Sequence, residues 1–172
     1  MRADATAERI EGMLRAVGRR ADSGARAYLA GGATAVLYGW RDSTRDVDVR
    51  VEGPDEGVLR AIATLKDTLD INIELAGPLD FLPAPQGWQE RAILLGRYGN
   101  LTVYHTPLEL QALAKLQRGF DQDLADVDAM LARGLTSAAD IAGTFDAVCG
   151  ELYRFPSVDA QRLQAAVTSL SR

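Results

Sequence analysis

Apolar and polar residues alternate with two different periods along the chain, and the change falls near residue 106. Before it, short segments with a period of two predict strands, and longer segments with a period near 3.6 predict helices. After it, only the helical period remains. Strands are predicted at 28–30, 46–51, 71–75, 92–98 and 101–104, the last two forming a hairpin. Helices are predicted at 5–19, 31–38, 56–68, 108–118, 121–133, 138–152 and 158–170.

This order of elements predicts an α/β (α+β) fold with a mixed sheet and flanking helices, followed by a C-terminal helical bundle. We expect residues 1–105 to form the α/β core and residues 106–172 to form a helical portion packed on it. A chain of 172 residues is long enough for one domain with a substantial core. Ser137 and Asp140 predict a capping box at the start of one C-terminal helix.

Two carboxylates interrupt the apolar pattern of the strand predicted at 46–51. Asp46 and Asp48 are two residues apart and therefore point to one face, while Val47 and Val49 point to the other. Neighbouring carboxylates repel each other, and a cation between them offsets that repulsion. Oxygen ligands suit Mg²⁺ or Mn²⁺, which combine one or two carboxylates with phosphate oxygens of a substrate. The pair predicts phosphoryl or nucleotidyl transfer, although an isolated pair is more often two exposed acids.

The glycines upstream strengthen the functional interpretation. Gly31 and Gly32 open the predicted helix at 31–38, and a residue without Cβ allows a triphosphate to approach the backbone closely. The hydroxyls of Ser43 and Thr44 precede the acids, where they either bond a phosphate or close a turn.

A third carboxylate is expected on a neighbouring strand if the site holds metal ions. Glu74 is the preferred candidate, because it lies on the polar face of the strand at 71–75 together with Asn72. Asp80 is the alternative.

Three charged residues of the helical portion are further candidates. Lys115 lies on an otherwise apolar helix with Arg118 after it, and Asp126 lies on the next helix. Lys115 and Arg118 either contact nucleotide phosphates, with Asp126 orienting the cation, or the group forms an interhelix salt bridge.

Composition narrows the classes of function. The net charge of −5 argues against a broad nucleic-acid-binding surface, and a single histidine, His105, argues against His-based metal sites. The single cysteine, Cys149, excludes an internal disulfide, suits a reducing cytoplasm and is expected to be buried. No segment approaches the roughly 18 apolar residues that a membrane span needs.

The chain resembles the polymerase β-like nucleotidyltransferase superfamily, and within it a small bacterial family of nucleotidyltransferase-like domains of unknown function related to AbiEii-type toxins. The resemblance is carried by the segments 31–34, 44–48, 72–78, 80–83, 115–116 and 123–127. It implies that Asp46 and Asp48 bind the metal and that Glu74 supplies a third acid. It also implies that Lys115 and Asp126 are essential. The position of Glu74 after Asn72 departs from active members that carry Asp directly on this strand.

The leading hypothesis is a Mg²⁺- or Mn²⁺-dependent enzyme that transfers a nucleotide from a nucleoside triphosphate to an acceptor hydroxyl, with tRNA as the acceptor and a cognate antitoxin as partner. The catalytic candidates are Asp46, Asp48, Glu74, Lys115 and Asp126. The nucleotide-binding candidates are Gly31, Gly32, Thr34, Ser43, Thr44, Arg45, Lys115 and Arg118. The alternatives are a catalytically degenerate scaffold with a regulatory, antitoxin-like role and an enzyme that modifies a small molecule such as an antibiotic.

Overall fold

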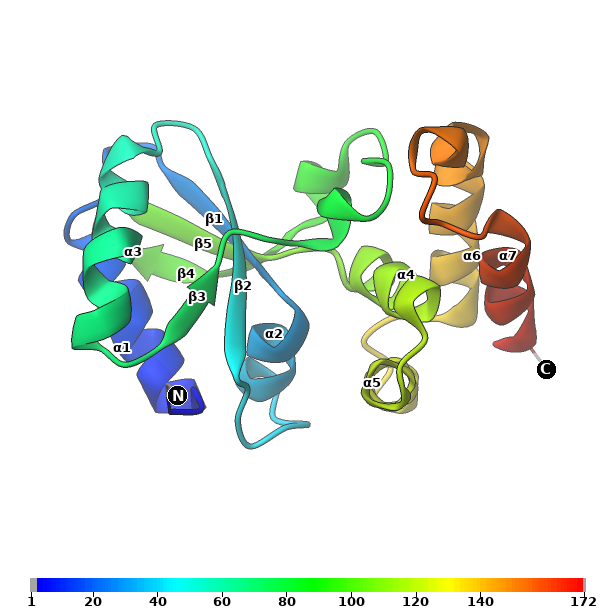
Figure 1. Ribbon diagram of the computed structural model, residues 1–172, viewed down its shortest axis with the longest axis horizontal. Coiled ribbons are helices and arrows are strands. Elements are labelled where there is room, and N and C mark those ends of the chain that lie inside the picture. The colour runs from blue at the N-terminus through cyan, green and yellow to red at the C-terminus, as the bar shows by residue number, and fades with distance from the viewer. Residues whose placement is uncertain (1–2, 172) are drawn as a thin grey trace. The chain divides into compact units, whose positions relative to one another are not determined.

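The computed structural model describes residues 3–171, which form seven α-helices and a five-stranded sheet (Figure 1). These residues group into two compact units. The first unit contains the described residues up to Gly77 together with Ala92–His105. The second contains Pro78–Arg91 and the described residues from Thr106 onward. The mixed sheet with helices confirms the predicted fold class.

The sheet of the first unit has the strand order β3-β2-β1-β5-β4. Its strands are β1 (Arg26–Ala30), β2 (Asp46–Glu52), β3 (Asn72–Glu74), β4 (Ile93–Tyr98) and β5 (Leu101–His105). The pairs β1–β5 and β2–β3 are parallel, whereas β1–β2 and β4–β5 are antiparallel. The predicted hairpin is therefore confirmed as the pair β4–β5.

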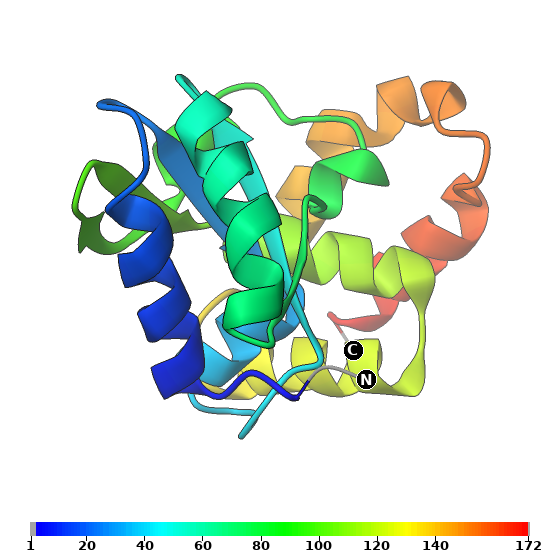
Figure 2. The same cartoon turned by 60° about the vertical axis from the view of Figure 1, so that its left-hand side comes forward.

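Helices α1 (Ala7–Gly18) and α3 (Glu56–Thr68) lie on the same face of this sheet, as Figures 1 and 2 show. Between helices and sheet lies the apolar core, to which β2 contributes Val47 and Val49 and β3 contributes Ile73. Helix α2 (Gly31–Leu37) follows β1 and packs against β2. The core therefore takes the apolar set of each strand and leaves the alternate residues on the opposite face.

The second unit is helical. Its α-helices are α4 (Leu108–Arg118), α5 (Asp121–Ala132), α6 (Ala138–Val148) and α7 (Ala160–Ser169). Three 3₁₀ segments accompany them: η1 (Pro78–Asp80), η2 (Trp88–Arg91) and η3 (Cys149–Arg154). The predicted capping box is present, because Ser137 Oγ accepts from the backbone N–H of Asp140 while the Asp140 carboxylate accepts from that of Ser137.

Helix α6 differs most from its prediction. The helix expected over 138–152 ends at Val148, and the chain continues as the 3₁₀ segment η3. The change of pitch leaves Cys149 exposed, so the prediction that this thiol is buried was wrong. Its Sγ–H donates to the carbonyl of Asp146 at 3.3 Å.

Within residues 3–171, no helix combines the length and the apolar character that crossing a bilayer requires.

His105 links the end of β5 to α2 inside the first unit. It is 3% exposed, and its Nδ1 lies 3.0 Å from the hydroxyl of Thr34, which is itself fully buried. The ring of Tyr38 packs against the imidazole with a centroid separation of 4.9 Å. Burial lowers the pKa of His105 from 6.5 to about 4, so the imidazole is neutral at physiological pH.

Acidification should therefore destabilise the protein through His105. As the pH falls below 6.5, His105 becomes protonated in the unfolded chain, whereas in the folded chain it stays neutral down to its pKa of about 4. The free energy of unfolding therefore falls as the pH is lowered from 6.5 to 4. The gap between the two pKa values corresponds to about 3 kcal/mol. We expect His105→Asn, which keeps a hydrogen-bonding group facing Thr34 without the titration, to lose less stability than the wild type in urea unfolding between pH 6.5 and 4. Identical pH profiles would contradict this assignment.

Candidate active site

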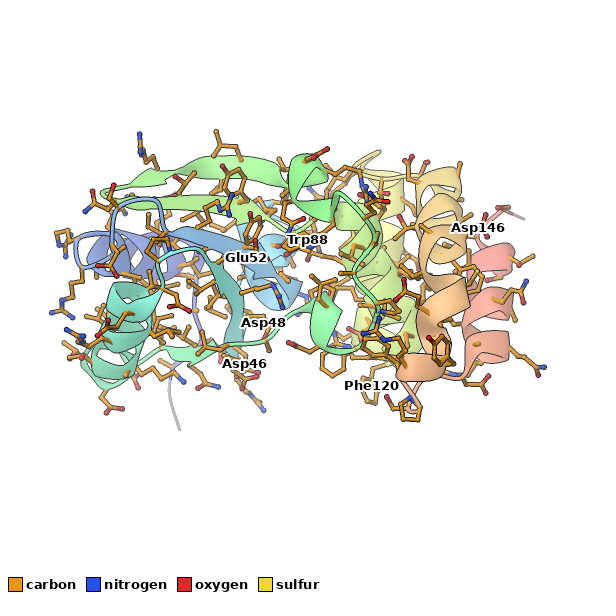
Figure 3. The ribbon with its side chains drawn as sticks, turned by 90° about the horizontal axis from the view of Figure 1, so that it is seen from above. Asp46, Asp48, Glu52, Trp88, Phe120 and Asp146 are labelled. Carbon is orange, nitrogen blue, oxygen red and sulfur yellow. The ribbon has the colours of Figure 1, made fainter. Side chains whose placement is uncertain are left out.

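Strand β2 places the two predicted metal ligands side by side. Asp46 and Asp48 are half-buried on one face of the strand, and Val47 between them is fully buried on the other. Figure 3 shows the two acids following each other along β2, with Glu52 further along the same strand. Alternation along one strand therefore fixes two carboxylates on a common surface.

Gly31 and Gly32 are required where they stand, because side chains of the chain itself fill the space beside them. Gly31 has a φ of +60°, and a Cβ there would lie 2.4 Å from Asp48 Oδ2. A Cβ on Gly32 would lie 1.9 Å from the hydroxyl of Thr44. The missing Cβ atoms thus make room for Asp48 and Thr44, and a contact between these glycines and a triphosphate stays a prediction. The glycines seat the acid pair and the loop before it.

The loop before β2 is fixed by short contacts. Thr44 pairs through its backbone with Ala5, and its Oγ1–H donates to the carbonyl of Asp46 at 3.0 Å. Ser43 donates to the Asp4 carboxylate at 3.5 Å. Arg45, in contrast, is exposed directly before the first acid. Thr44 thus holds the start of β2 in place.

The neighbouring strand β3 supplies an amide beside the acids. Asn72 Nδ2 donates to Asp46 Oδ1 at 2.7 Å and to Glu74 Oε1 at 3.1 Å. Glu74 itself is exposed. Among residues 3–171, no group of three His, Cys, Asp or Glu side chains comes together in a way that could hold a metal ion. The alternative acid, Asp80, ends η1 in the second unit.

The charged candidates of the second unit form a buried cluster between α4 and α5. Lys115 Nζ lies 2.6 Å from Asp126 Oδ2 and 3.4 Å from Asp123 Oδ1, and all three side chains are nearly inaccessible. The partly exposed Arg118 also pairs with Asp123. Two cations and two carboxylates make the cluster neutral. Its geometry agrees with the interhelix salt bridge, which was one of the two interpretations of these residues from the sequence. A contact between Lys115 and a nucleotide phosphate stays a prediction.

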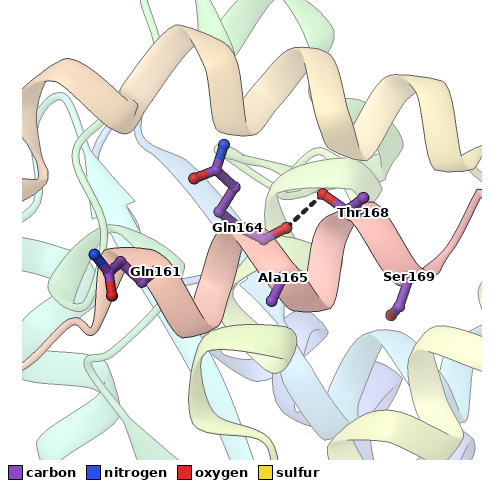
Figure 4. A pocket seen from close by; sticks show the side chains of 5 residues that line it. All are labelled: Gln161, Gln164, Ala165, Thr168 and Ser169. Atoms are coloured by element: carbon purple, nitrogen blue, oxygen red, sulfur yellow. Dashed lines mark hydrogen bonds between the residues drawn. The ribbon is translucent and has the colours of Figure 1, made fainter.

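Two hollows of the second unit contain none of the predicted site residues. One lies along α7 and is lined by Gln161, Gln164, Ala165, Thr168 and Ser169, with Thr168 donating to the Gln164 carbonyl (Figure 4). The other includes Arg91, whose guanidinium pairs with Glu109 at 3.1 Å. Neither hollow includes Asp46 or Asp48 of β2.

Comparison with known proteins fits this geometry. Residues 9–146 match the family described as "Nucleotidyltransferase of unknown function (DUF6036)". The chain belongs to this family. The matched range runs from α1 into α6 and contains every candidate site residue of both units. No curated protein and no solved structure matches the chain. Membership in this nucleotidyltransferase family agrees with the fold and with the acid pair that follows the Gly31-Gly32 turn.

The sequence did not predict that Asn72 donates hydrogen bonds to Asp46 and Glu74. The signal was present, because Asn72 and Glu74 alternate on their strand as Asp46 and Asp48 do on theirs. What was lacking was the register, which pairs Asn72 with Asp46 and Glu74 with Asp48.

Replacement of Gly31 by alanine should test whether the Asp48 carboxylate needs the space beside this glycine. The change combines a strained positive φ with a clash against Asp48 Oδ2, and we expect it to cost about 2–4 kcal/mol of unfolding free energy. Gly134→Ala is a matched control, since Gly134 has a φ of +64° but open space around a Cβ, and it should cost only about 1 kcal/mol. Equal losses for the two variants in urea unfolding would show that the carboxylate does not press on Gly31.

Removal of the Lys115 charge should destabilise the protein strongly. Lys115→Met leaves Asp126 buried without its cation, and we expect a loss of about 3–5 kcal/mol. The double variant Lys115→Met/Asp126→Leu removes both charges and should recover much of that loss. As a control, Arg15→Met breaks the exposed pair with Glu11 and should cost less than about 1 kcal/mol. A double variant as unstable as Lys115→Met would refute the assignment of a charge-balanced cluster.

Proposed function

We propose that this protein is a metal-dependent nucleotidyltransferase, which transfers a nucleotide from a nucleoside triphosphate to an acceptor hydroxyl. The observation that carries the proposal is the seating of two carboxylates, Asp46 and Asp48, on one face of β2 directly against the Gly31 turn. Membership in a nucleotidyltransferase family supports it.

The residues present fit a divalent cation. Asp46 and Asp48 offer oxygen ligands only, and Mg²⁺ or Mn²⁺ is held in proteins by one or two carboxylates together with phosphate oxygens. The missing Cβ of Gly31 leaves room for the Asp48 carboxylate, which a side chain at that position would displace. When bound, the cation would neutralise phosphate charge and polarise the α-phosphate.

The remaining roles fall to side chains around the acids. Arg45 is exposed next to Asp46 and would contact the triphosphate, while Thr44 fixes the strand that carries the acids. The acceptor oxygen would attack the α-phosphorus in line and lose its proton to water. The bond from the α-phosphorus to the bridging oxygen would break, and pyrophosphate would leave. Holding the two reactants in line supplies much of the rate in such a transfer.

We propose tRNA as the acceptor and a toxin–antitoxin pair as the setting, on the strength of the resemblance to AbiEii-type toxins. The net charge of −5 implies that contact with RNA is local and confined to arginines such as Arg41, Arg45 and Arg50 around the acid pair. A single cysteine suits the reducing cytoplasm in which such a pair would act.

The second candidate is a nucleotidyltransferase scaffold that binds a partner without catalysis. The observation that favours it is Asn72, a neutral amide that contacts Asp46 at a position where a further carboxylate would complete a larger metal site. Metal-dependent nucleotide binding separates the two candidates, because a degenerate site would show none.

Asp48→Asn should reduce transfer on the order of 100-fold or more while leaving the fold intact, since it removes one of the two charges that hold the cation. The measurement incubates the purified protein with each of four labelled nucleoside triphosphates, Mg²⁺ or Mn²⁺, and total tRNA. Asp55→Asn is the matched control, because Asp55 is exposed and its side chain caps no helix. Circular dichroism would confirm that both variants fold.

Label on RNA with the wild type and with Asp55→Asn, but not with Asp48→Asn, would support the proposal and identify the nucleotide. Unchanged activity in the double variant Asp46→Asn/Asp48→Asn would contradict it. Absence of label, together with absence of metal-dependent nucleotide binding, would favour the scaffold.

A further inference from the structure

Strand β3 completes a polar surface of four side chains with β2. The parallel register sets Asn72 opposite Asp46 and Glu74 opposite Asp48. Residues paired in this way point to the same face of a sheet, whereas Ile73 and Val47 lie in the core on the other face. Three of the four side chains carry a carboxylate, and the fourth is an amide.

The amide of Asn72 lies between two of these carboxylates. Its Nδ2 donates to Asp46 Oδ1 at 2.7 Å and to Glu74 Oε1 at 3.1 Å. An amide nitrogen carries two hydrogens, and both are used here. The orientation of the amide follows from its partners, because both are carboxylates and accept only. A protein amide N–H repels a cation, so the amide in this orientation closes the position between Asp46 and Glu74 to a metal ion.

This closure limits the number of cations. Sites with two metal ions hold them about 3.5–4 Å apart and need carboxylates that reach both. Among residues 3–171, no three acidic, His or Cys side chains gather in a metal-binding arrangement. Asp46 and Asp48 together suffice for a single Mg²⁺ or Mn²⁺ that also takes phosphate oxygens.

We infer that Asn72 restricts the acid pair of β2 to a single divalent cation, by holding Asp46 with an amide at the position where a second cation would bind. Asn72 is thus a positioning residue, and Glu74 acts through it by fixing the amide. This inference rests on the proposed function, since it describes the same site.

The test counts Mn²⁺ bound to the full-length protein by electron paramagnetic resonance, with Mn²⁺ alone as the probe and then with a non-hydrolysable nucleoside triphosphate. The wild type should bind one Mn²⁺ per chain. Asn72→Asp replaces the amide by a carboxylate of the same shape and should bind two, with the broadened spectrum of coupled ions. Asn72→Ser removes the amide without adding charge and should still bind one.

Two Mn²⁺ ions on the wild type, or one on Asn72→Asp, would overturn the inference and leave the proposed function standing. Absence of bound Mn²⁺ on the wild type, even with the triphosphate, would overturn both. Melting temperatures without metal would establish that the variants fold. If Asn72→Asp does not fold, the count on the wild type still decides, since one ion supports the inference and two ions refute it.

Discussion

The contact between Asp48 and Gly31 determines how the first unit can present its two acids. The antiparallel register pairs Asp48 with Ala30, the last residue of β1, so the chain must turn into α2 directly beside the carboxylate. A positive φ and a missing Cβ at Gly31 make that turn possible. Gly32 repeats the arrangement with Thr44, whose hydroxyl fixes the backbone of Asp46. The positions of the two acids therefore depend on the two glycines.

Core packing and the acid pair are coupled through strand alternation. Val47 and Val49 lie in the core with Ile73, and a shift of β2 by one residue would bury the carboxylates and expose the valines. The free energy of burying the apolar set thus holds Asp46 and Asp48 on the outer face, despite the repulsion between them. The hydrophobic core thus keeps two like charges together on one face of the strand.

Much of the fold could be predicted from periodicity and turn residues. Helix α4 has the predicted bounds, because Pro107 precedes it and Gly119 ends it with a φ of +73°. The prediction for α6 overran, since apolar spacing does not distinguish the 3₁₀ segment at Cys149 from a further α-helical turn. Asp46 and Asp48 could be identified from their spacing along one strand, but the bond from Asn72 depends on the pairing of two strands, which one strand's pattern does not contain.

The buried cluster around Lys115 and the acid pair of β2 differ in the groups that contact their carboxylates. Lys115 meets Asp126 with a full positive charge, and with Arg118 and Asp123 the cluster carries no net charge. Asn72 meets Asp46 with a neutral amide, which fixes the carboxylate in place but leaves its negative charge intact. A lysine or arginine at that position would satisfy the acid and remove its attraction for a metal ion. An uncharged donor therefore suits the proposed function, in which Asp46 keeps its charge for a cation that arrives with the substrate, and this distinguishes the face of β2 from the cluster around Lys115.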